Sequence, residues 1–355
     1  MFVVRLLECQ VRVIRKFLMY AMNSIRIWRM IQCTSSSEST KVHGTITGNE
    51  SISVGLKKIG VILVNTGTPS GYSYWPIRRY LWEFLSDQRV IELPRIFWWP
   101  VLHLLVLIRP FNIGKSYRNR KKQKGTGSAE DRVFVKRHGS LDKESRHRCN
   151  KLVIVPLFPQ FSAVTNASVF DETCRCLMKQ RHQMALSVVP AFYDNKMYVE
   201  AIVKHLGAAL RKFRTAPEVV IVSYHGIPLS YQINGDPYGF QCKHTTALIR
   251  QSMPTFNCDL LTTFQSRLGP AEWLKPYTDE TVIQLAKSGV KRIMVIAPGF
   301  FSDCLETTEE LGSELADNYR KYGGEEFVYV PCLNDSTEAI DLLESLSRKH
   351  IQCFL

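Results

Sequence analysis

Short apolar runs, rich in β-branched residues, alternate with longer stretches of helical periodicity from about residue 58 to the end of the chain. Each apolar run predicts a buried strand, and each longer stretch predicts a helix. The strands are expected within 59–69, 152–162, 186–189, 219–222, 260–264, 292–298 and 327–331. The helices are expected near 80–84, 167–179, 198–213, 243–251, 279–288, 305–322 and 338–349. Strands that alternate with helices form parallel sheets, so the pattern predicts the α/β class.

The chain divides into two halves of similar plan. Each half opens with an apolar strand that ends in a turn containing Gly and Pro, at 59–69 and at 219–228. This repetition predicts two doubly wound lobes, 58–213 and 214–355, which face each other across an active-site cleft. Neither half contains GxGxxG or GxxxxGK[ST], so neither carries a nucleotide-binding fingerprint.

The apolar stretch 95–111 allows two interpretations. Its apolar core of 13 residues is shorter than the ~20 residues that a membrane-spanning helix needs. It is therefore either a helix of the protein core or the apolar lip of a pocket, resting on a membrane surface.

The formal net charge of +14 at first suggests a nucleic acid or a membrane as partner. Residues 1–44 carry a net charge of +5 and residues 115–151 carry +9, so the rest of the chain is neutral. The folded part is therefore not predicted to bind nucleic acid. Residues 118–150 show almost no apolar periodicity, and we expect a basic, solvated loop there.

The leader 1–57 begins with arginines set among apolar residues, and Glu8 is the only acid in its first thirty positions. This composition is typical of a mitochondrial presequence, which would place the protein in the mitochondrion. If the leader is merely disordered, the protein is expected in the cytoplasm. The 10 cysteines form no CxxC pair, which argues against a zinc ribbon and for reduced intracellular thiols.

The candidate chemistry lies at two strand exits. His225 follows the strand at 219–222, at the carboxyl edge where α/β sheets bind ligands. Asp303, Glu306 and Glu310 follow the strand at 292–298, spaced to lie on one helical face. The alternatives are a histidine satisfied within its loop and acids that cap a first helical turn. The functional interpretation is a line of carboxylates leading to His225.

One imidazole and one carboxylate suit a first-row divalent metal such as Fe²⁺. Two ligands hold a metal weakly, which fits an ion that is passed on better than an ion that is kept. A histidine that faces carboxylates can also take up protons and pass them outward.

At this level of detail the chain resembles the ferrochelatases in their bacterial-type form. The blocks that carry the resemblance lie within 58–117 and 151–335, and they are ILVNTGTP, LVIVPLFPQFS, IVSYHGIP, TTFQSRLGPAEWLKPYTDET and PGFFSDCLETTEE. The resemblance implies the class II chelatase fold, with two Rossmann-like lobes. It also implies insertion of ferrous iron into protoporphyrin IX to form protohaem, with Fe²⁺ as a substrate and without a resident cofactor.

The resemblance also assigns roles to individual residues. His225 corresponds to the catalytic histidine that contacts the metal, and Glu306 corresponds to its carboxylate partner in iron binding. The other positions correspond to substrate-binding residues: Arg109 and Tyr117 at the porphyrin propionates, Thr66 and Ser162 beside the macrocycle, and Asp303 and Glu310 in the acidic line. The stretch 95–108 resembles the pocket lip through which the porphyrin arrives from a membrane.

Two departures from the family pattern leave alternatives open. Residues 118–150 replace a GGSP turn and a strand that carries porphyrin contacts, so a non-catalytic porphyrin- or haem-binding relative is one alternative. A chelatase for another metal or tetrapyrrole is another. Retention of His225 and Glu306 favours the active enzyme. The C-terminal residues IQCFL lack the cysteine cluster of the animal-type enzymes, so no iron–sulfur centre is expected.

Overall fold

The structure, a computed structural model, describes three parts of the chain. These are residues 59–67, 73–123 and 149–354, without 182, 212, 214, 255, 257 and 268, and in 111–123 it describes the backbone only. The predicted leader 1–57 lies outside the described residues, as does most of the basic segment 118–150.

The first lobe is built on a sheet of three parallel strands. They are β1 (Ile59–Val64), β2 (Lys151–Pro156) and β3 (Ala185–Val188), in the order β1-β2-β3. Its helices are α2 (Tyr74–Leu85), α3 (Arg95–Gln123), the π-helix η2 (Ala163–Ala167), α5 (Ser168–Met178) and α6 (Lys196–Leu210). Successive side chains of β2 point to opposite faces. Leu152 and Ile154 pack with Leu177 of α5, whereas Val153 and Val155 face the main core of the molecule.

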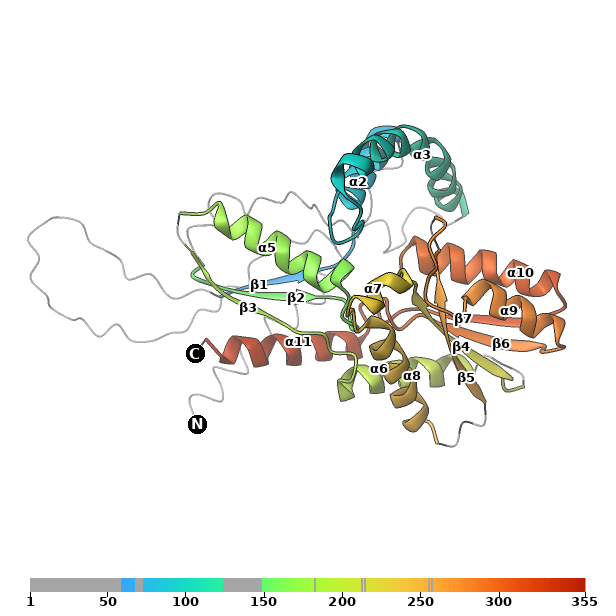
Figure 1. Cartoon of the computed structure of the whole chain (residues 1–355). Helices are drawn as coiled ribbons and strands as arrows, with labels where there is room; N and C mark the ends of the chain where they lie inside the picture. Colours follow the sequence, from blue (N-terminus) through green and yellow to red (C-terminus); the bar gives the residue numbers. More distant parts are fainter. Residues whose placement is uncertain are drawn as a thin grey trace, which may run out of the picture.

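The second lobe has four parallel strands. They are β4 (Val219–His225), β5 (Asp259–Gln265), β6 (Arg292–Ile296) and β7 (Glu326–Val330), in the order β5-β4-β6-β7. Its helices are α7 (Leu229–Ile233), α8 (Tyr238–Gln251), α9 (Thr278–Lys287), the π-helix η3 (Glu306–Glu314), α10 (Leu315–Lys321) and α11 (Thr337–Gln352). Figure 1 shows β4 inside this sheet, with helices on both sides. The predicted α/β class and parallel pairing are confirmed.

A single hydrophobic core runs through both lobes. It contains Val153 of β2, Leu206 of α6 and Val220 of β4, all of them fully buried. Helix α11 also crosses between the lobes, because it packs against β2 and α6 although it closes the chain. The lobe limits 58–213 and 214–355 stay a prediction. The shared core and α11 pack the two lobes directly against each other.

Helices α2 and α3 form a hairpin that projects from the body of the molecule (Figure 1). The hairpin has a small core of its own, in which Leu81 of α2 packs with Trp98, Leu102 and Val106 of α3. The opposite side of α3 exposes large apolar side chains, namely Ile96, Phe97, Trp99, Val101, Leu104, Leu107 and Ile108. The interpretation of 95–111 as a core helix is therefore wrong for most of its apolar residues.

Two helix predictions need correction at their ends. Helix α2 begins at Tyr74, before the expected 80–84, and α3 continues to Gln123, into the segment expected to be a loop from residue 118. Continuing an existing helix adds one backbone hydrogen bond for each residue ordered, so a helix extends into polar sequence without apolar periodicity. Within the described parts of the chain, no helix combines the length and the apolar character needed to cross a membrane.

Candidate active site at the strand exits

The carboxyl ends of strands from both lobes meet at one place. Asn65, just after β1, donates a hydrogen bond from Nδ2 to the Oγ atom of Ser302, 3.0 Å away and 237 positions later in the sequence. Ser302 lies in the loop that leaves β6. This contact brings the first-lobe turn, which includes the exposed Thr66, to the edge where the second-lobe candidates lie.

His225 is the last residue of β4 and is half-buried. Its Nδ1 atom lies 2.6 Å from the backbone oxygen of Gly226, and its ring centroid lies 6.3 Å from that of Phe300. A carbonyl oxygen only accepts hydrogen bonds, so Nδ1 carries the proton. In the neutral ring this leaves the lone pair on Nε2, which makes Nε2 the basic atom.

Glu306 and Glu310 lie on the π-helix η3, four positions apart. The Glu310 carboxylate accepts hydrogen bonds from the backbone nitrogen of Ser266 (3.0 Å) and from its hydroxyl (2.7 Å). Burial raises the pKa of Glu310, and the charge of Glu306 raises it further, against the Ser266 hydroxyl bond and the charge of His225. The Glu310 carboxylate thus interacts electrostatically with both Glu306 and His225, although His225 comes from a different strand exit. Single-turn π-helical segments are frequent at functional sites.

Asp303 lies before η3 and does not share its face. Its carboxylate accepts hydrogen bonds from the Tyr329 hydroxyl (2.8 Å), from Asn334 Nδ2 (2.7 Å) and from the Thr307 hydroxyl (3.1 Å). The expectation of three acids on one helical face is therefore wrong for Asp303, which lies outside η3 and whose carboxylate is bonded to β7 and to the segment after it. Asp303 does not cap η3 either, because the N-cap position is Leu305 and has no side-chain cap bond. Its role in substrate binding stays a prediction.

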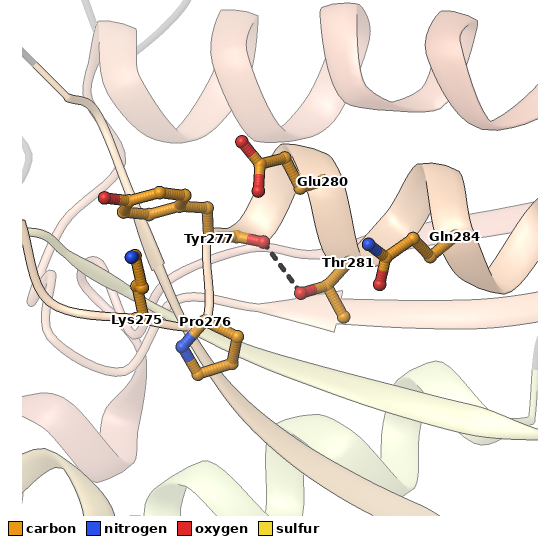
Figure 2. Close-up of a pocket in the computed structure, with 6 residues that line it drawn as sticks. All are labelled: Lys275, Pro276, Tyr277, Glu280, Thr281 and Gln284. Carbon is orange, nitrogen blue, oxygen red and sulfur yellow. Dashed lines mark hydrogen bonds between the residues drawn. The ribbon is translucent and has the colours of Figure 1, made fainter.

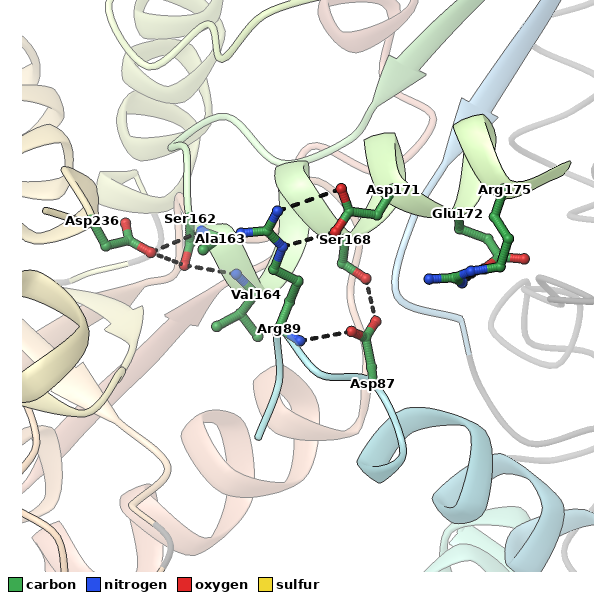
Figure 3. Close-up of polar contacts among 10 residues, drawn as sticks. All are labelled: Asp87, Arg89, Ser162, Ala163, Val164, Ser168, Asp171, Glu172, Arg175 and Asp236. Carbon is green, nitrogen blue, oxygen red and sulfur yellow. Dashed lines mark hydrogen bonds and ion pairs between the residues drawn. The ribbon is translucent and has the colours of Figure 1, made fainter. Parts of the chain in front are cut away.

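Ser162 is buried at the junction between the lobes (Figure 3). Its hydroxyl donates to Asp236 Oδ2 at 2.8 Å and accepts from the backbone nitrogen of Val164, which caps η2. Asp236 Oδ2 also accepts from the backbone nitrogen of Ala163 at 2.8 Å. The side chain of Ser162 is thus held within the protein, and its predicted contact with substrate stays a prediction.

Arg109 and Tyr117 both lie on α3. The side chain of Arg109 is half-buried, and that of Tyr117 lies outside the described residues. Their shared helix is the one that exposes the apolar face.

Sequence reasoning missed two residues that hold the site together. Gln265 and Ser266 were assigned only to a strand exit, yet each bonds directly to η3. Ser266 adopts φ 64°, which is unusual for a residue with a side chain and has no signature in the sequence.

Two further observations limit the site. Among the described residues, no group of three or more His, Cys, Asp or Glu side chains is arranged to hold a metal ion. A surface hollow of about 410 Å³ lies against α9 and is lined by Lys275, Pro276, Tyr277, Glu280, Thr281 and Gln284 (Figure 2). It contains none of the candidate residues, so the strand exits remain the candidate site.

Comparison with known proteins settles the family. A family model described as Ferrochelatase matches residues 58–128 and 138–351. The chain belongs to the ferrochelatase family. The match includes 118–128 and 138–150 and passes over 129–137, so most of the basic segment that was expected to depart from the family pattern aligns with the family model. The predicted family and function are thereby confirmed.

Curated ferrochelatases match over nearly their whole length. The chain is 43% identical to the ferrochelatase of Chelativorans sp. (strain BNC1), over 90% of this chain and 98% of that protein. It is also 43% identical to the ferrochelatase of Brucella anthropi, over 84% of this chain and 93% of that protein. Among solved structures, SirB from Bacillus subtilis with Fe3+ matches with TM-score 0.42 and 12% identity, over 58% of this chain and 73% of that one.

Proposed function

We propose that this member of the ferrochelatase family is a lyase that inserts Fe²⁺ into protoporphyrin IX and releases protohaem. The observation that carries the proposal is the arrangement of His225, with a basic Nε2 atom, beside the carboxylates of η3. Insertion of Fe²⁺ into the ring displaces two pyrrole protons. The site therefore has to supply a base, a group that delivers the metal and a route for protons.

In the proposed mechanism Glu306 and His225 Nε2 first hold the incoming Fe²⁺ together. These two ligands bind the ion loosely, which allows its transfer to the four ring nitrogens. When the ring nitrogens take the metal, the lone pair of Nε2 is released and accepts a pyrrole proton, and the second pyrrole proton follows once Glu310 has taken the first. Glu310, whose pKa is raised mainly by burial, takes the proton from His225 and passes it outward.

We place the porphyrin beside α3, with its propionates at Arg109 and Tyr117. A guanidinium and a phenol both donate hydrogen bonds to carboxylates. The exposed apolar side of α3 then faces a membrane surface, from which the apolar porphyrin arrives. Replacing Ile96 and Phe97 by Ser should weaken binding to liposomes while iron insertion into detergent-solubilised porphyrin continues. Liposome binding equal to wild type would contradict this placement.

The cellular location depends on the leader 1–57. We propose that a working presequence brings the enzyme to the matrix side of the mitochondrial inner membrane, and that an unused leader leaves it in the cytoplasm. A fusion of residues 1–57 to a fluorescent protein distinguishes these locations directly.

The decisive experiment incubates the purified protein with Fe²⁺ and protoporphyrin IX and follows haem absorbance. Wild type should form haem, and His225→Ala should lose about 10²-fold or more in rate while porphyrin binding is kept. His244→Ala, an exposed histidine on α8, is the matched control and should keep full activity. Porphyrin that binds without becoming haem would indicate a non-catalytic relative, and insertion of Co²⁺ alone would indicate a chelatase for another metal.

A further inference from the structure

Gln265 connects the strand of His225 to the helix of Glu306. It is the last residue of β5, is 3% exposed and pairs with His225 across the sheet. Its backbone oxygen accepts from the nitrogen of Gly226 at 2.7 Å, and its side-chain Nε2 donates to the backbone oxygen of Glu306 at 3.1 Å. One buried residue therefore contacts the residue after the histidine on one side and the iron-binding glutamate on the other.

The amide of Gln265 is held in one orientation. The hydroxyl of Ser223, two residues before His225 on β4, donates to Gln265 Oε1 at 3.0 Å. Ser223 is fully buried and also lies 2.8 Å from the hydroxyl of Thr278. Because Oε1 is occupied by a donor from β4, Nε2 is directed at η3. Buried polar groups bonded in this way favour a single arrangement of the elements they join.

The backbone next to His225 has no freedom to adjust. A Cβ atom at Gly226 would lie 2.9 Å from the backbone oxygen of Gln265 and 3.1 Å from the ring of Trp273, so this close approach needs glycine. Ser266, the residue that follows Gln265, makes a second connection to η3. It binds the Glu310 carboxylate through both its backbone nitrogen and its hydroxyl. Two consecutive residues thus hold two positions of η3 that are four residues apart.

We propose that Gln265 is a positioning residue that sets the separation between His225 and Glu306. This inference rests on the proposed function, in which these two side chains share the metal and the pyrrole protons. Gln265 does not contact substrate itself. It acts by fixing the first residue of η3 relative to the end of β4, and a misplacement of about 1 Å at a reacting centre can cost about 10²-fold in rate.

The test compares Gln265→Met with Thr278→Val. Methionine keeps the volume of glutamine but loses the acceptor for Ser223 and the donor to Glu306. Valine at 278 removes a buried hydroxyl from the same network without touching η3, so it reports the cost of disturbing the network alone. We expect Gln265→Met to lower kcat about 10- to 100-fold and to raise the KM for Fe²⁺, with the porphyrin Kd within about twofold. Thr278→Val should leave all three within about twofold.

A second measurement is independent of catalysis. Hydrogen–deuterium exchange in a peptide covering 306–314 should rise in Gln265→Met and stay at the wild-type level in Thr278→Val. Gln265→Leu, which likewise lacks both the acceptor for Ser223 and the donor to Glu306, replaces methionine if that variant does not fold. If the wild type is active and the Gln265 variants keep the wild-type kcat and the wild-type hydrogen exchange, the positioning role of Gln265 is overturned and the proposed function is not. An inactive wild type overturns the proposed function, and the exchange result then decides whether Gln265 holds η3.

Discussion

The carboxylate of Asp236 is the clearest polar connection between the lobes, and its removal should destabilise the whole molecule. The side chain is 8% exposed in the turn between α7 and α8. It accepts from the Ser162 hydroxyl and the Ala163 nitrogen of the first lobe, both at 2.8 Å, and from the Tyr238 nitrogen at 3.0 Å. Asp236→Ala leaves these donors without their partner in a largely buried place (Figure 3).

A hydrogen bond to a charged group contributes about 1.5–3 kcal/mol. The two bonds between the lobes, taken at the lower end because water can reach part of the vacated space, give a loss of about 3 kcal/mol. At about 2 °C per kcal/mol for a chain of this size, Tm should fall by about 6 °C. Asp236→Asn keeps one oxygen for the two donors of the first lobe, so its loss should be smaller.

The assay is urea unfolding followed by circular dichroism, with Asp259→Ala as the control. Asp259 is an exposed carboxylate at the start of β5, and its removal should change the free energy of unfolding by no more than about 0.5 kcal/mol. If Asp236→Ala were as stable as Asp259→Ala, the bonds to Ser162 and Ala163 would not hold the lobes together.

Three further predictions follow from burial and charge. Leu102 is 0% exposed inside the α2–α3 hairpin, and Leu102→Ala should lower the free energy of unfolding of that hairpin by about 2–5 kcal/mol, measured by urea denaturation. Leu104 is 59% exposed, and Leu104→Ala should lower it by no more than about 0.5 kcal/mol. Equal losses in the two variants would contradict the assignment of the buried and exposed faces of α3. The folded-state pKa of Glu310 is raised, so its stabilisation is complete below the unfolded pKa and is lost as pH rises through the folded pKa. Glu310→Gln should therefore gain Tm relative to wild type between pH 4 and pH 8, and parallel Tm curves would refute this. Arg89→Ala removes an exposed ion pair with Asp171, in which the two charged groups lie 2.8 Å apart. The free energy of unfolding, measured in urea, should fall by less than about 1 kcal/mol, and the difference should vanish in high salt. A larger or salt-independent loss would be evidence against a screened surface pair.

Much of the fold could be predicted because buried parallel strands leave a local signature. The run at 219–222 is continuous and β-branched, and it forms the fully buried part of β4. The length of α3 could not be predicted in this way, because its last residues are polar and carry no period. Its exposed apolar side was equally hidden, since an apolar run does not reveal which of its faces finds a partner.

The side chains of the candidate site could be predicted from the sequence, but the hydrogen bonds that hold them in place could not. His225 was expected at a strand exit and lies there, and Glu306 and Glu310 lie on one helix as their spacing indicates. Asp303 was misjudged because the helix begins after it and its carboxylate bonds to Tyr329 and Asn334 instead. Gln265 was overlooked because its importance comes from its pairing with His225 across the sheet. The sequence of one strand does not reveal which residue of another strand it pairs with.

The sequence by itself determined the order of strands and helices, the polar residues at the strand exits and membership of the ferrochelatase family. The order of strands and helices depends on local backbone preference and on the period of apolar residues, which are read within a few positions. Family membership rests instead on the similarity of the chain to known ferrochelatases. Only the tertiary structure decided that Nδ1 of His225 donates to the Gly226 oxygen, that burial raises the pKa of Glu310 and that Gln265 joins β4 to η3. The first depends on the local conformation at the end of β4. The other two depend on residues far apart in the sequence, such as Gln265 and Glu306 with 3.1 Å between their bonded atoms, and only the packing of the whole chain closes the loops between them.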